Sequence, residues 1–143
     1  MASISIQATG KYSAEELSSS SIETQDNILV AQASIVVPEQ IKNARSMLNE
    51  KGYSVGITSQ SVKAQSPKNI KGSRGLYITF VGSRPNGRKS KRTAEVAYLN
   101  EFGISGRMSS RGFIAKANES TADECAETAA DIYAAWVADQ IQI

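Results

Sequence analysis

Histidine is absent from this chain of 143 residues, and cysteine occurs once, at Cys125. Because histidine is the commonest general base and the commonest metal ligand, its absence argues against Ser–His hydrolases and most metal sites. A structural zinc site needs four Cys or His ligands, so that site is excluded as well. A single cysteine forms no internal disulfide. Its place among small residues of an expected helix predicts a buried, inert thiol rather than a nucleophile.

The glycines supply no phosphate-binding loop. Gly72, Gly75, Gly82 and Gly87 have the spacing of turns rather than of a nucleotide-binding motif. Paired carboxylates at a recognisable catalytic spacing are lacking too. We therefore expect no enzyme activity, no catalytic residues, no metal and no cofactor.

Long apolar runs are also lacking. No stretch reaches the roughly 18 residues of a membrane span, and the first residues lack the basic-then-apolar layout of a signal peptide. A hydrophobic content of 41% and a charged content of 21% are typical of soluble globular proteins. We expect one soluble domain with a modest core and no membrane partner, made and used in the cytosol.

Acidic residues are missing from the middle third of the chain. Residues 51–94 carry ten basic side chains and no acid, whereas residues 1–50 carry six acids and three bases. Residues 95–143 return to eight acids and three bases. A basic band between two acidic flanks can complement an identical neighbour or face nucleic acid, and composition does not choose between these.

Residues 1–22 are predicted to form a flexible N-terminal arm, followed by one α+β domain at residues 23–143. Ile4 and Ile6 alternate with polar residues, but the serines 18–21 interrupt any apolar face. The arm is therefore expected to be poorly ordered alone, or to dock on a partner as a short strand and linker.

Residues 23–51 have the apolar spacing of a helix, with Gly52 as its stop. Pro38 lacks a backbone donor and disfavours helix before it, so we predict a kink or a break into two helices there. For the β-branched run at residues 28–37, a strand is the competing prediction.

Short extended segments follow. A strand is predicted at residues 61–65 and a clearer one at residues 75–83, whose two apolar faces indicate a central or doubly covered strand. The sequence Arg-Pro-Asn-Gly at residues 84–87 has strong turn chemistry. Residues 88–92 are expected to be a charged connection.

Two helices are predicted in the last third. Residues 94–102 fit a strand or a helix, and their alanines favour a short helix ended by Gly103. From Phe113 the chain is expected to be helical for almost thirty residues. The predicted fold class is α+β: a small, mainly antiparallel sheet from residues 57–83, packed by an N-terminal helical region and the long C-terminal helix.

The most specific motif lies between residues 95 and 117. An apolar segment ends in an acid, an aromatic and a glycine, a loop with two arginines follows, and a second aromatic opens an alanine-rich helix. This pattern resembles the tail-component or tail-completion proteins of long-tailed phages and prophages, in which a Glu-Phe-Gly segment precedes an Arg-Pro-Phe turn and a C-terminal helix. The matching residues are Asn100, Glu101, Phe102 and Gly103, then Arg111, Gly112 and Phe113.

The resemblance covers roughly residues 25–140 and is strongest at residues 94–117. It implies a structural virion protein, without enzyme activity, at the head–tail junction or the top of the tail. Such proteins form a ring, commonly of six copies, that completes the tail or joins it to the head connector. The implied partners are further copies of the chain, head connector or neck proteins, and tail tube or tail terminator proteins. The implied location is the virion tail or neck, with assembly in the host cytoplasm.

Glu101 is the acid of this motif. We predict that it pairs with Arg107 or Arg111, so that the loop is fixed as a structural clasp; a solvated helix end is the competing interpretation. Phe113 is predicted to anchor the start of the long helix in the core. Gly112 stands where the family has proline, which predicts a more flexible turn.

A basic segment precedes the motif, and its bases are Arg84, Arg88, Lys89, Lys91 and Arg92. It fits a solvated turn, a contact with an acidic flank of a neighbouring subunit, or a non-specific contact with packaged DNA. The alternative function is a nucleic-acid-binding module that uses the basic band at residues 51–94. A steep loss of DNA affinity with salt would mark such a module.

Overall fold

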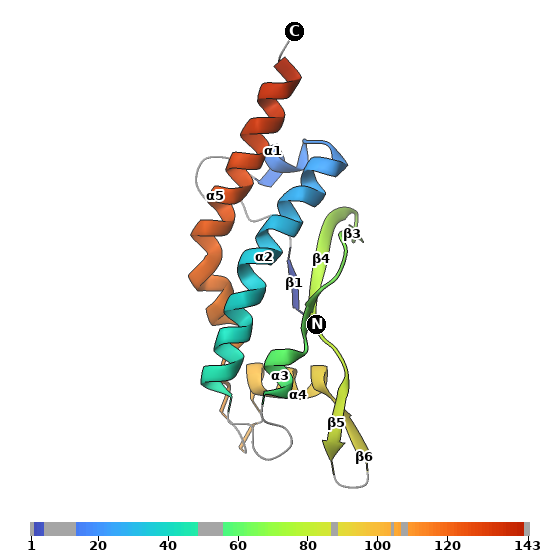
Figure 1. Cartoon of the computed structure of the whole chain (residues 1–143), viewed down its shortest axis with the longest axis vertical. Coiled ribbons are helices and arrows are strands. Elements are labelled where there is room, and N and C mark those ends of the chain that lie inside the picture. Colours follow the sequence, from blue (N-terminus) through green and yellow to red (C-terminus); the bar gives the residue numbers. More distant parts are fainter. Residues whose placement is uncertain are drawn as a thin grey trace.

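Two long antiparallel helices, α2 (Ile22–Met47) and α5 (Phe113–Ile141), run side by side and form the body of the protein (Figure 1). A small antiparallel sheet packs against α2, and α4 (Thr93–Phe102) lies near the end of α2 and the start of α5. The fold is therefore α+β, as predicted. The structure is a computed structural model, and it describes the residues 2–4, 14–48, 56–86, 89–103, 105–106 and 109–141.

The central strand of the sheet is β4 (Ser73–Phe80). It pairs antiparallel with β1 (Ala2–Ile4), with β2 (Val62–Ala64) and with β3 (Lys68–Ile70). The strands predicted at residues 61–65 and 75–83 are thus present, and the second is the central one. Because β4 has neighbours on both edges and α2 over one face, its alternating apolar residues are buried.

The main core lies between α2, α5 and the sheet. Two aromatic rings meet there edge to face, since the ring centroids of Phe80 and Phe113 are 5.9 Å apart at an interplanar angle of 71°. Around them the core is completed by buried aliphatic side chains, among them Leu29, Val36, Leu76 and Ile78.

Helix α2 is continuous through Pro38, so the predicted break and the competing strand at residues 28–37 are both wrong. Proline in a helix interior removes one hydrogen bond and disfavours the helix by about 3 kcal/mol. Here Pro38 lies on the exposed side, while Val36 and Gln40 on either side of it are buried. Burial of the opposite face therefore outweighs the local preference.

Part of the predicted arm packs on the domain. Residues 2–4 form β1, and residues 14–18 form the short helix α1 (Ala14–Ser18). Leu17 of α1 is 1% exposed and packs with Ile28 and Ala129 in a second, smaller apolar cluster. The serine run also has a structural role, because Ser21 Oγ accepts the backbone N–H of Thr24 (3.2 Å) and caps α2.

The structure adds a hairpin that the sequence did not predict. Residues expected to be a turn and a charged connection form β5 (Ser83–Asn86) and β6 (Lys89–Arg92), which pair antiparallel and run directly into α4. The hairpin projects from the lower end of the molecule in Figure 1. The short helix α3 (Ile57–Gln60) precedes β2.

One ion pair ties the sheet to α2. The guanidinium of Arg74 on β4 donates from Nε to Oδ1 of Asp26 (2.9 Å) and from Nη2 to Oδ2 (2.7 Å), which is a bidentate pair. The hydrogen bond to Asp26 raises the pKa of Arg74. None of the helices in the described ranges is long and apolar enough to cross a membrane.

Candidate functional site

The motif residues converge where α4, the end of α2 and the start of α5 meet. Helix α4 has two different faces. Thr93, Ala97 and Glu101 are buried on its inner face, whereas Tyr98 and Phe102 are exposed on its outer face. Gly103 ends the helix at φ +77°, as predicted, and its N–H donates to the carbonyl of Leu99 (2.7 Å).

The carboxylate of Glu101 caps the N-terminus of α5. The backbone N–H of Ile114 donates to Oε2 (2.7 Å), and that of Ala115 donates to Oε1 (3.0 Å). These N–H groups belong to the first turn of α5, where no partner exists within the helix. The negative charge also interacts favourably with the helix dipole. Glu101 is 8% exposed, so the solvated helix end is wrong.

The predicted pairing of Glu101 with Arg111 is wrong as well. Between these two described residues there is no ion pair, because Nη1 of Arg111 donates to the carbonyl oxygen of Met47 (3.0 Å) at the end of α2. A cation at a helix C-terminus binds a carbonyl that the helix leaves unpaired. The acid and the base thus satisfy two different helix ends. The other predicted partner, Arg107, lies outside the described residues.

Backbone hydrogen bonds close the turn before α5. The N–H of Arg111 donates to the carbonyl of Asn100 (2.8 Å), and the N–H of Gly112 donates to the carbonyl of Glu101 (3.2 Å). Gly112 has φ +59°, in the left-handed region that a proline ring cannot adopt. Glycine thus provides both the angle and the donor that this turn uses, and the greater flexibility of the turn stays a prediction. We call the contacts of Glu101, Arg111 and Gly112 the helix-end clasp.

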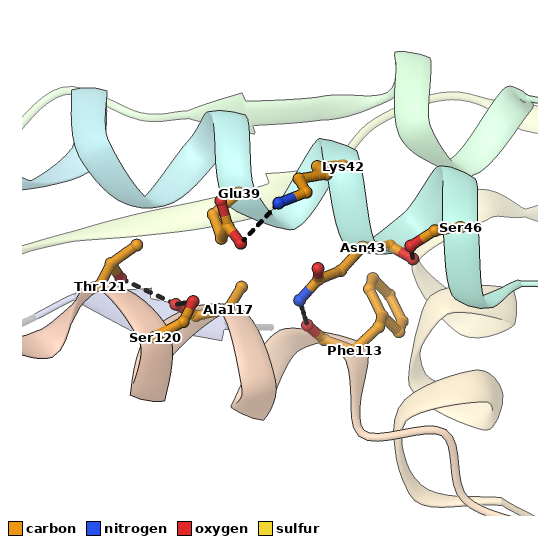
Figure 2. A network of polar contacts seen from close by, with 8 residues as sticks. All are labelled: Glu39, Lys42, Asn43, Ser46, Phe113, Ala117, Ser120 and Thr121. Carbon is orange, nitrogen blue, oxygen red and sulfur yellow. Dashed lines mark hydrogen bonds and ion pairs between the residues drawn. The ribbon is translucent and has the colours of Figure 1, made fainter.

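Phe113 anchors the start of α5, as predicted. Its ring is fully buried in the main core. Figure 2 shows Asn43 of α2 reaching across to this residue, and Nδ2 of Asn43 donates to the carbonyl of Phe113 (3.1 Å). The first turn of α5 is thus held by Glu101 through its N–H groups and by Asn43 through a carbonyl.

Further polar contacts join α2 to α5. Nε2 of Gln40 donates to Oδ1 of Asn118 (3.3 Å), and Nε2 of Gln32 donates to the carbonyl of Cys125 (3.1 Å). The Cys125 thiol is fully buried, as predicted. Burial raises the pKa of this thiol; the charge of Glu124 adds to the rise and the Thr121 hydroxyl opposes it. This environment suits a packed thiol and not a nucleophile.

The outer face of α4 presents an aromatic pair to solvent. Tyr98 is 58% exposed and Phe102 is 65% exposed, and their ring centroids are 4.8 Å apart. Phe102 was predicted as a motif residue, whereas Tyr98 was not predicted as a site residue. The four-residue spacing of two aromatics on a predicted helix was the signal that could have found it.

Four basic residues of the segment 84–92 lie on the strands of the β5–β6 hairpin, namely Arg84, Lys89, Lys91 and Arg92. The register pairs Ser83 with Arg92, Arg84 with Lys91 and Asn86 with Lys89. Arg88 lies outside the described residues, and Arg92 is exposed at the start of α4.

An open groove of about 470 Å³ lies elsewhere, between α2 and the chain that follows β2, and Val30, Val37 and Pro67 contribute to its lining. It contains no residue of the motif.

Among the described residues, no group of three or more His, Cys, Asp or Glu side chains could hold a metal ion. Comparison with models of protein families, with curated proteins and with solved structures gave no match. The family assignment therefore stays a prediction from the motif.

Proposed function

We propose that the protein is a structural virion component of a tailed phage or prophage. In this role it acts without enzyme activity at the head–tail junction or the tail top, by forming an oligomeric ring. The sequence support is the motif at residues 95–117, and the structural support is the surface that this motif creates. The ring, commonly of six copies in the family, then contacts head connector or neck proteins on one side and tail tube or terminator proteins on the other.

The observation that carries this proposal is the contrast between the two faces of α4. Its inner face is fixed to α5 through Glu101, while its outer face exposes Tyr98 and Phe102 side by side. Exposed aromatic side chains on a rigid element are typical anchors of protein–protein interfaces. A monomer gains nothing from two such rings in water, whereas a neighbouring subunit would bury them.

In this proposal the helix-end clasp has a positioning role. A ring closes only if each subunit meets the next at a fixed angle. The clasp joins α4 to both long helices through Glu101 and Arg111, so the aromatic pair keeps one orientation relative to the body. Assembly then depends on geometry and needs no bound cofactor.

The test is the mass of the purified protein in solution, measured by sedimentation velocity and native mass spectrometry. We expect a closed oligomer for the wild type, with rings in negative-stain images. Replacing Tyr98→Ser and Phe102→Ser together should give monomers at the same concentration with an unchanged circular-dichroism spectrum. The matched control is Ile22→Ser with Val30→Ser, which removes two other exposed apolar residues and should leave the oligomer intact. A wild type that is monomeric at every concentration would contradict the proposal.

A partner test follows from the proposed place in the virion. The genes on either side should encode head connector proteins and a tail tube protein. Each of these products should bind the purified oligomer in a pairwise mixture. Binding to neither, or neighbouring genes of unrelated function, would place the protein elsewhere.

The second candidate is nucleic-acid binding, which the pairing of basic residues on the β5–β6 hairpin favours. Phosphate contacts would make the affinity for duplex DNA fall steeply with salt. Titration of the wild type with DNA at several salt concentrations tests this, and a lack of binding at low salt removes this candidate.

A further inference from the structure

The β5–β6 hairpin places basic residues at neighbouring positions, and their mutual repulsion is unfavourable in an isolated molecule. Arg84 lies directly opposite Lys91, and Lys89 follows two residues away on the same strand. Opposite residues of an antiparallel pair, and alternate residues of one strand, share a face. Arg84, Lys89 and Lys91 therefore occupy positions on one face, which we call the basic ribbon. Like charges directly opposite one another destabilise a hairpin.

Helix α5 carries the opposite pattern on its exposed side. Glu119, Asp123, Glu127 and Asp131 follow one another at four-residue intervals, and all four are exposed. Residues four apart are neighbours on a helix surface, where like charges repel. The only basic residue of α5 is Lys116. We call this row the acidic ridge.

The two rows match in spacing. Residues two apart on a strand are separated by about 6.7 Å, and residues four apart on a helix are separated by about 6 Å. A basic ribbon laid along an acidic ridge can thus bring several opposite charges close together at once. Electrostatic complementarity of this kind fixes the register of an interface.

One molecule cannot make this contact with itself. In Figure 1 the hairpin projects from the lower end of the molecule, while α5 runs from the middle to the top. We propose that the basic ribbon of one copy docks on the acidic ridge of a second copy, as part of the self-association given above as the proposed function. The contact joins two different surfaces of the chain. Each copy therefore offers its basic ribbon to one neighbour and its acidic ridge to another. Repetition of such a contact closes a ring or extends a filament.

A second copy fits the ribbon better than duplex DNA. The chain carries only two net positive charges, and the acidic residues of α5 would repel phosphates. Helix α4 follows the ribbon directly and exposes Tyr98 and Phe102, which suit a protein partner rather than a phosphate backbone.

Charge reversal tests the contact. The ribbon variant carries Lys89→Glu and Lys91→Glu, and the ridge variant carries Asp123→Lys and Glu127→Lys. We expect each variant alone to weaken self-association about 100-fold in sedimentation velocity, because like charges then face one another across the contact. An equimolar mixture should restore wild-type assembly, because each reversed ribbon then meets a reversed ridge. Circular dichroism verifies that each variant is folded.

The matched control is Lys63→Glu with Lys71→Glu, which makes the same change of charge at exposed positions away from the hairpin and should assemble like the wild type. Normal assembly of both reversal variants would overturn the contact and leave the proposed function standing. Failure of the mixture to recover would overturn the pairing of these two surfaces. A wild type that never assembles would overturn the contact together with the proposed function. A ribbon variant that assembles normally but loses salt-sensitive binding to duplex DNA would assign the ribbon to DNA instead.

Discussion

The two ends of the α2–α5 helix pair are held by different chemistry. At one end, Glu101 and Arg111 bind backbone groups at the start of α5 and the end of α2. At the other end, Leu17 of α1 packs with Ile28 and Ala129 in a small apolar cluster. Charged hydrogen bonds fix a direction, whereas apolar contacts tolerate small shifts. The clasp end therefore fixes the direction in which the two helices meet, whereas the far end adds apolar contact without fixing a direction.

The largest expected effect comes from introducing the proline of the family pattern at the clasp end. Gly112→Pro demands φ near −65° where the turn has +59°, and it removes the N–H that donates to Glu101. We expect a loss of more than about 3 kcal/mol in urea unfolding. Gly112→Ala should lower the free energy of unfolding by about 1–2 kcal/mol, because alanine is strained at a positive φ. The control Gly106→Ala, at φ +74° outside the clasp, should lower it by the same amount, so any larger effect of Gly112→Pro reflects the lost N–H and the proline ring. Equal stability of Gly112→Pro and wild type would refute this turn geometry.

Removing the acid of the clasp ranks second. Glu101→Ala leaves the N–H groups of Ile114 and Ala115 without their acceptor, so we expect a loss of about 2–3 kcal/mol. Glu101→Gln keeps one acceptor oxygen, so its loss of stability should be about half that of Glu101→Ala. Hydrogen exchange should accelerate in the first turn of α5 and not at its far end. The exposed Glu95→Ala on the same helix is the control and should change stability by less than about 0.5 kcal/mol.

A substitution at the far end should destabilise that end of the helix pair and leave the clasp end unchanged. Leu17→Ala removes a side chain that is 1% exposed, and we expect a loss of about 2 kcal/mol. Hydrogen exchange should then accelerate near Ala129 while the first turn of α5 stays protected. Since the two sites share no partner, the Leu17→Ala and Glu101→Ala losses should add. A clear departure from additivity would show that the two ends are coupled.

The smallest expected effect is the pH dependence of stability that comes from Cys125, in the middle of the α2–α5 pair. Burial raises the pKa of Cys125 in the folded protein, so the unfolded chain loses this proton first as pH rises. The stabilising contribution is complete below the ordinary thiol pKa of about 8.5 and is lost as pH rises toward the folded value. The stability of wild type should therefore decline more steeply above that pH than that of Cys125→Ala. Parallel curves would contradict a buried neutral thiol.

Much of the fold follows from local patterns. The alternation in residues 75–83 predicted β4, Gly103 predicted the end of α4, and Phe113 predicted the start of α5. Each depends on neighbours in the sequence, since strand alternation and helix stops are short-range effects. The α+β class then followed, because a central strand and two long helices must bury their apolar faces against one another.

The clasp could be located but not connected correctly from the sequence. The motif placed Glu101 and Arg111 together, and opposite charges suggested an ion pair. The structure gives each a backbone partner on a different helix, and these partners depend on where α2 ends relative to α5. The continuity of α2 through Pro38 was not predicted for the same reason, because burial of Val36 and Gln40 is a tertiary effect. The β5–β6 hairpin was missed because charged residues have low strand propensity.

The antiparallel pairing of α2 with α5 also has a consequence for the order of folding. During synthesis the chain emerges from its N-terminus, so β2, β3 and β4 can pair once residue 80 has left the ribosome. Helix α2 then still lacks the cover of α5, whose first residue is Phe113. The face of α2 that packs on α5, which includes Gln32, lacks that cover until the last quarter of the chain has been made. The two long helices can therefore pair only late in synthesis, after the sheet strands have been made.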